Sequence, residues 1–292
     1  MSVPMNALCW QCHLKRHVGT AREIGGEEAA NAVMRELMQA YLDAPKDAGS
    51  PYFGPKVTEL LEKYCGLTGD RYAEEKKMSN RFVLERLDKI ESVAENAEDP
   101  VYAGLQLAVL GNYIDFSALQ GEVSFEKLDE MLQQAEKMEL DRDAYAALLS
   151  DLEKGRNLLY LTDNAGEIGF DQVCARQIKK RFPHLNITFC VRGGNAANDA
   201  TREDAAEMGV EFPIIDNGSC IAGTIPELLG AEAKQAMEAA DVILSKGQAN
   251  VETLFGCGYN IYYAFLIKCE RFIHLFDKPK LTPMLLKVKT SG

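Results

Sequence analysis

Apolar positions along the chain follow two different periods, and the change between them lies near residue 155. Before it, apolar residues recur every three or four positions with charged residues between them, as at Val83, Leu87, Ile90, Ala94 and Ala97. This spacing is typical of amphipathic helices. Further helical candidates are 27–42, 56–65, 101–116 and 124–150, with loops or turns at 43–55, 66–70 and 120–122.

After residue 155, short apolar runs alternate with helical patterns. The candidate strands are 157–162, 186–191, 211–215, 241–245, 261–267 and 284–288. Such alternation predicts a mostly parallel sheet covered by helices. We therefore predict an α/β fold, in which a helical N-terminal region (1–154) packs on a doubly wound, mostly parallel sheet (155–292) with helices on both faces.

Composition limits the classes of function. Of the 292 residues, 47% are hydrophobic and 26% charged, and the net charge is −12. This acidic balance argues against nucleic-acid and anionic-membrane partners, which reward basic patches, so an anionic substrate needs a local cationic pocket. Neither a signal-peptide core nor an uncharged apolar run of about 18 residues is found. We expect a cytoplasmic protein whose eight cysteines are thiols or metal ligands. The oligomeric state stays open.

Three of the predicted strands end abruptly in polar residues and glycine. Asp163 and Asn164 follow the first strand, Asp199 lies in the loop after the second, and Lys246 follows the strand at 241–245. Right-handed crossovers bring the carboxyl ends of parallel strands to one edge of a sheet. These four side chains can therefore converge, although they lie far apart in the sequence.

Several segments in a fixed order make up one motif set: Asp163 to Glu167, Val191 to Gly193 with Asn198 to Thr201, Lys246 to Asn250, Lys268 to Glu270, and Gly111 to Phe116. This set resembles that of the damage-control phosphatases, long catalogued as domain of unknown function 89, over nearly the whole chain. The segment Cys9-Trp10-Gln11-Cys12 resembles the prokaryotic-type subfamily with an N-terminal CxxC.

The resemblance implies a helical part packed on an α/β sheet and a divalent ion at the sheet edge that supports hydrolysis of small phosphate esters. It implies Asp163, Asn164 and Asp199 as metal ligands. The substrate would then be a small phosphorylated metabolite. The chain departs from the family at residues 194–197, where relatives often carry proline and bulkier apolar residues, and this difference bears on loop stiffness and substrate shape.

The chemistry of the residues agrees with the resemblance. Two carboxylates and an amide oxygen form a hard site suited to Mg²⁺ or Mn²⁺, with Co²⁺ and Ni²⁺ as alternatives. The structural alternative is that Asp163 is a turn residue and Asp199 a helix N-terminal acid; their shared edge with Lys246 favours the metal. Asp163, Asp199 and Glu167 are the catalytic candidates, and Glu167 either accepts a proton from the attacking water or caps a helix.

Phosphate needs cationic or amide partners. Lys246 follows a strand and precedes glycine, so its ammonium is a candidate point charge for phosphate, and Arg192 and Asn198 are further candidates. Thr201 and Asp204 fit a capping box and are assigned to structure.

Two other functions compete with phosphatase chemistry. A carboxyl methyltransferase also uses a doubly wound sheet, but residues 166–169 do not match the GxGxxG fingerprint. A non-catalytic metal- or redox-binding protein would use Cys9 and Cys12, whose spacing also fits haem attachment or half a zinc site. We expect this CxxC to lie before the first long helix, apart from the hydrolytic site.

Overall fold

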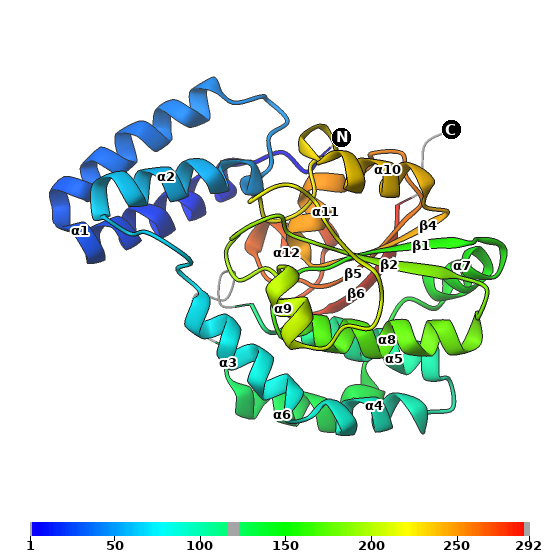
Figure 1. The fold of residues 1–292 in the computed structure, drawn as a ribbon. Helices are drawn as coiled ribbons and strands as arrows, with labels where there is room; N and C mark the ends of the chain where they lie inside the picture. The colour runs from blue at the N-terminus through cyan, green and yellow to red at the C-terminus, as the bar shows by residue number, and fades with distance from the viewer. Residues whose placement is uncertain (1, 116–122, 289–292) are drawn as a thin grey trace.

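The computed structural model describes residues 2–115 and 123–288 (Figure 1). Six strands form one sheet in the order β3-β2-β1-β4-β5-β6, in which β1 to β5 are parallel and β6 is antiparallel to β5. The strands are β1 (Asn157–Leu161), β2 (Asn186–Val191), β3 (Ile214–Asp216), β4 (Val242–Lys246), β5 (Ile261–Leu266) and β6 (Pro283–Lys287). The predicted doubly wound, mostly parallel sheet is therefore confirmed. The predicted turn at 120–122 lies outside the described residues.

Both faces of the sheet are covered because its central strands alternate between two apolar cores. Leu158 and Tyr160 of β1 lie in one core, and Leu159 and Leu161 lie in the other. The first core holds α5 (Pro100–Gly111) and α8 (Glu167–Arg181). The second holds α10 (Ala231–Ala239), α11 (Gln248–Leu254) and α12 (Glu270–Phe276). Figure 1 shows these two helical layers on opposite sides of the strands.

The chain begins with a helical hairpin that projects from the body of the molecule (Figure 1). Its elements are α1 (Ala7–Asp43), whose two segments fold back on each other at Gly26 with the Trp10 and Tyr41 rings 4.6 Å apart, and α2 (Gly54–Cys65), which follows a 3₁₀ turn, η1 (Ser50–Phe53). The second half of α1 matches the predicted helix 27–42. The expectation that the CxxC precedes the first long helix is wrong, because Asn6 caps α1 by accepting a hydrogen bond from the Cys9 amide.

The remaining helices pack under the sheet or at its edge. They are α3 (Ala73–Leu84), α4 (Leu87–Glu95), α6 (Phe125–Gln133), η2 (Ala135–Lys137), α7 (Arg142–Lys154), α9 (Arg202–Glu207) and η3 (Pro226–Leu228). The single helices predicted at 83–97 and 124–150 were wrong, since the first segment holds the end of α3 and the whole of α4, and the second holds α6, η2 and most of α7. For example, the Asp141 side chain accepts a hydrogen bond from the Ala144 amide, and this N-cap begins α7 as a separate helix. The predicted capping box of Thr201 and Asp204 is confirmed at α9.

The apolar core crosses the boundary expected between the two regions. Buried residues of α3 to α7 belong to the same core as Leu158 and Tyr160 of β1. The division into 1–154 and 155–292 stays a prediction about sequence organisation. None of the helices in the described part of the chain is long and apolar enough to cross a bilayer.

Candidate active site at the carboxyl edge of the sheet

The loops after β1 and β2 are joined by their backbones. Asn164 and Asp199 form an isolated antiparallel bridge, in which the Ala200 amide donates to the Asp163 carbonyl at 2.7 Å and the Ala165 amide to the Asn198 carbonyl at 2.9 Å. Because strands β1 and β2 are adjacent and parallel, both loops leave the same edge of the sheet. The predicted convergence of Asp163, Asn164 and Asp199 is thus produced by main-chain hydrogen bonds.

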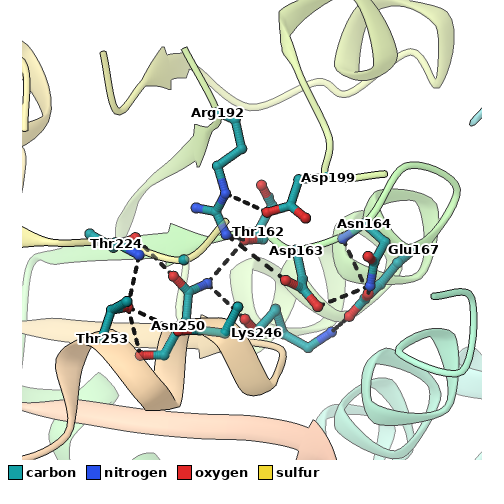
Figure 2. Close-up of polar contacts among 12 residues, drawn as sticks. Thr162, Asp163, Asn164, Glu167, Arg192, Asp199, Thr224, Lys246, Asn250 and Thr253 are labelled. Atoms are coloured by element: carbon teal, nitrogen blue, oxygen red, sulfur yellow. Dashed lines mark hydrogen bonds and ion pairs between the residues drawn. The ribbon is translucent and has the colours of Figure 1, made fainter. Parts of the chain in front are cut away.

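The loop after β4 closes on the same carboxylate. Gly247 has φ +78°, and a Cβ placed there would lie 1.9 Å from an Asp163 carboxylate oxygen. Only glycine allows this approach of backbone to side chain. The Asn250 side-chain amide, in the first turn of α11, donates to the Thr162 carbonyl at 3.1 Å and to the Lys246 carbonyl at 2.7 Å, which ties the β1 and β4 loops together (Figure 2).

Burial and mutual repulsion raise the pKa values of the Asp163 and Asp199 carboxyl groups at this edge. The pKa of Asp163 is raised well above its ordinary value by burial and then by the nearby Asp199 and Glu167. Burial also raises the pKa of Asp199 to about 6, although the Arg192 guanidinium opposes the shift. A cation bound between these groups would relieve the repulsion and favour both charged forms.

Two further residues of this edge come from segments that only the motif set had marked. Asp115, just after α5, accepts from the Lys268 ammonium at 2.7 Å, and Asn112 donates to Asp163 Oδ2 at 2.9 Å and to Glu167 Oε1 at 3.1 Å. Asn112 and Asp115 belong to the 111–116 segment, and Lys268 to the 268–270 segment. Residue types alone did not single them out, although the segments themselves were recognised.

Lys246 lies beneath the loops, away from solvent. Its ammonium is fully buried and contacts Glu167 Oε1 at 2.6 Å, Asp171 Oδ1 at 2.8 Å and the Ala108 carbonyl at 2.8 Å (Figure 2 shows the Glu167 contact). Burial alone lowers its pKa, but the neighbouring Asp171 and Glu167 raise the pKa above its ordinary value. These three acceptors use all three N–H donors of the ammonium. Its expected contact with phosphate stays a prediction, and here it would require one of these acceptors to be displaced.

Glu167 opens α8, as expected, and is fully buried. Besides Lys246, it accepts from the Asn164 amide group at 2.6 Å, so it positions a candidate metal ligand. Its expected role as a proton acceptor stays a prediction.

Arg192 and Asn198 hold other members of the site in place. Arg192 Nε donates to Asp199 Oδ2 at 2.6 Å and its Nη2 to the Thr162 carbonyl at 3.2 Å, as Figure 2 shows. The Asn198 amide donates to Asn164 Oδ1 at 2.9 Å. Both side chains are buried, and their expected contacts with phosphate stay predictions.

A cavity of about 250 Å³ opens onto the carboxylates. Its lining includes Asp115, Asp163, Asn164 and Asp199, whereas Glu167, Arg192, Asn198 and Lys246 are not part of it. Residues 195–197, where the chain departs from the family pattern, also line it. The rest of the wall comes from α1, η1, α2 and the connection between α2 and α3, and from the loop after β3 and the start of α11. The helical region therefore shapes the site together with the sheet.

The donor set fits a hard divalent cation. The carboxylates of Asp115, Asp163 and Asp199 and the Asn164 amide are among the groups that line the cavity. Lys268 pairs with Asp115 at 2.7 Å and Arg192 with Asp199 at 2.6 Å, whereas Asp163 lies 3.9 Å from Arg192. Oxygen donors of this kind suit Mg²⁺ or Mn²⁺. Within residues 2–115 and 123–288, no group of three or more His, Cys, Asp and Glu side chains is arranged to hold a metal. The expected ligands are fewer, being two carboxylates and an amide.

Comparisons with known proteins cover almost the whole chain. Residues 5–281 match the family model described as the damage-control phosphatase ARMT1-like domain. The chain is 29% identical to a damage-control phosphatase of Archaeoglobus fulgidus over 91% of this chain and 93% of that one, and 32% identical to an uncharacterised protein of Methanocaldococcus jannaschii over 92% and 90%. A crystal structure of a protein of the domain of unknown function 89 family from Pyrococcus horikoshii superposes with a TM-score of 0.81 at 25% identity, covering 98% of this chain and 99% of that one.

Proposed function

The chain belongs to the damage-control phosphatase ARMT1-like domain family, and from this premise we propose that it is a phosphatase that hydrolyses small phosphorylated metabolites with a divalent metal ion. The observation that carries the metal-dependent part is the cavity lined by Asp115, Asp163, Asn164 and Asp199. We further propose Mg²⁺, Mn²⁺, Co²⁺ or Ni²⁺ as the ion and a cytoplasmic location.

In this proposal Asp163, Asn164 and Asp199 hold the metal. When bound, a divalent ion neutralises charge on the phosphate and generates a nucleophile from water. The protein's own groups orient the ligands. Arg192 fixes the Asp199 carboxylate, and Asn112 fixes Asp163.

The test is phosphate release by metal-stripped protein from a panel of sugar phosphates, nucleotides and cofactor phosphates, with each metal restored separately. We expect release to depend on an added ion. Undiminished activity after exhaustive chelation would contradict the metal requirement.

Substitutions of the proposed metal ligands test their role separately from their contribution to the fold. Asp163→Asn and Asp199→Asn should each lower kcat/KM by about a hundredfold or more, equivalent to about 2.7 kcal/mol. The metal-free Asp163→Asn protein should melt no lower than the wild type, because a repelled buried charge is removed. Asp216→Asn is the control, since Asp216 ends β3 at the same sheet edge but does not line the cavity. Wild-type turnover in either test variant would show that its carboxylate is no ligand.

A further inference from the structure

The part of the cavity wall that comes from the helical region is basic. Arg16 of α1 and Arg71, which precedes α3, both line the cavity that holds the carboxylates. Among the described lining residues, these two arginines are the permanently charged cations, since Lys246, Lys268 and Arg192 do not line it. The chain has a net charge of −12, so this basic wall is unusual for its surface.

The guanidinium groups of Arg16 and Arg71 both contact one tyrosine. Arg16 Nη2 and Arg71 Nη2 donate to the Tyr72 hydroxyl at 3.1 Å and 3.2 Å, and the Arg71 guanidinium also lies over the Tyr72 ring, 5.0 Å from its centroid. A neutral phenol does not compensate the repulsion between two like charges held close together. Arg71 forms no ion pair with any residue that the structure describes.

Two histidines lie beside Arg16 on this wall. His13 and His17 line the cavity beside Arg16, and the pKa of His17 is lowered to about 2 by burial and then by His13, Arg16 and Arg71. His17 is therefore neutral at pH 7. Asp70 is the acidic group on this wall, and it lies 3.6 Å from the Lys76 ammonium.

We propose that Arg71, together with Arg16, binds a second anionic group of the substrate, so that the enzyme prefers metabolites carrying a carboxylate or second phosphate away from the phosphate that is cleaved. A guanidinium presents a planar fork of donors that matches both of these anions. The carboxylate-lined end of the cavity would hold the cleaved phosphate through the metal, and the basic wall would hold the far end of the molecule. This inference rests on the phosphatase activity proposed above.

Matched substrate pairs test the preference. Sorbitol 6-phosphate and 6-phosphogluconate differ by one terminal carboxylate at six carbons, and glycerol 3-phosphate and 3-phosphoglycerate differ likewise at three. Glucose 6-phosphate and glucose 1,6-bisphosphate provide the arm with a second phosphate. With whichever metal supports activity, we expect KM to be lower by about tenfold for the more anionic member of at least one pair, with kcat little changed.

Arginine variants assign the preference to the basic wall. Arg71→Met should raise KM for the more anionic member by about tenfold and leave the less anionic member unaffected, whereas Arg71→Lys should retain part of the preference because it keeps the charge but loses the fork. Arg16→Met should act in the same direction. Arg22→Met is the control, because Arg22 lies on the same helix but is exposed, pairs with Glu27 and does not line the cavity.

The outcomes separate this inference from the proposed function. If phosphate is released from both members of each pair with equal KM, and Arg71→Met changes neither, the basic wall does not select substrates although the phosphatase assignment stands. If no probe in the wider panel is hydrolysed with any metal, the proposed function fails and this inference fails with it. Melting temperatures of the variants show whether a change in KM reflects misfolding.

Discussion

At the scale of single residues, the buried lysine Lys246 is engaged by protein carboxylates and not exposed to a ligand. Lys246 ends β4 as expected, but its ammonium turns beneath the sheet edge and pairs with Glu167 and Asp171. Tyr160 donates to the same Asp171 oxygen at 3.0 Å. These four ionisable side chains thus form one hydrogen-bonded group with no exposure to solvent. Such a group is more sensitive to the loss of one partner than an exposed phosphate-binding lysine would be.

Replacement of Lys246 distinguishes these two roles. Lys246→Ala should lower the free energy of unfolding by about 3–5 kcal/mol, because two buried carboxylates lose their shared cation. Urea denaturation of the metal-free protein measures the change, and Lys234→Ala on α10 is the control. A Lys246→Ala protein as stable as the wild type, with only KM raised, would instead place the ammonium in contact with substrate.

The histidines of α1 predict a dependence of stability on pH. Burial and then Arg16 lower the pKa of His13 from its ordinary 6.5 to about 4. The unfolded chain therefore binds more protons than the folded chain between these values. The contribution of His13 is present in full above pH 6.5 and falls by about 1.4 kcal/mol per unit as the pH drops towards 4.

A variant isolates this effect from the titration of other groups. His13→Gln should lose less stability than the wild type between pH 6.5 and 4, as measured by chemical denaturation at several pH values. The control is His274→Gln, whose side chain is 64% exposed. Parallel stability curves for His13→Gln and the wild type would mean that His13 titrates normally.

At the scale of elements, the turns after the strands carry the site. The loop after β1 bridges to the loop after β2, and the turn from β4 into α11 presses its backbone against Asp163. Gly247 combines φ +78° with ψ 159°, a conformation that is essentially restricted to glycine. The close approach and the backbone conformation therefore demand the same residue.

Alanine substitutions at Gly247 and Gly258 separate the effect of the backbone conformation from that of the close approach to Asp163. Gly247→Ala should cost about 1–3 kcal/mol of backbone strain and should also displace Asp163, which lowers kcat/KM by more than about tenfold. Gly258→Ala is the matched control, because Gly258 has φ +91° but nothing within 4 Å of an added Cβ. The control should be strained but active. Equal activity of the two variants would show that the Asp163 carboxylate tolerates the added methyl.

At the scale of the whole molecule, the chain has one large body and one smaller appendage. Helices α3 to α8 share a core with the sheet. The hairpin of α1 and α2 has its own small cluster, formed by Ala21, Ala30, Val33, Leu37, Val57, Leu60 and Leu61. Yet His13, Arg16 and His17 of this hairpin line the active-site cavity. Opening of the hairpin would therefore open one wall of the site.

Hydrogen exchange should reveal this difference in local stability. We expect amides in the middle of each α1 segment and of α2 to exchange through a partial opening, at a lower free energy than amides of α5 and α8, which lie in the large core. Native-state exchange over a range of urea concentrations measures both. A single opening free energy for all four helices would mean that the hairpin unfolds only with the whole molecule.

The sequence by itself determined the elements and the region of chemistry. Apolar runs predicted all six strands, because strands covered on both faces are mostly apolar. The third strand starts later than predicted, at Ile214 instead of residue 211. The polar loops that follow these strands pointed to Asp163, Asn164 and Asp199, because parallel strands end at a common edge. Helix boundaries were less visible in the pattern. The starts of α1 and α7 depend on single capping side chains, Asn6 and Asp141, rather than on apolar spacing.

Only the tertiary structure decided which side chains meet and which way they point. Apolar spacing is set locally, whereas the Lys246 contacts with Ala108 and Asp171 span 138 and 75 residues of sequence. The sequence pattern around a lysine at the end of a strand does not show whether its ammonium points outward to solvent or inward to buried carboxylates. The basic wall of the cavity is also a product of folding, since Arg16 and Arg71 become neighbours only when Tyr72 accepts hydrogen bonds from both.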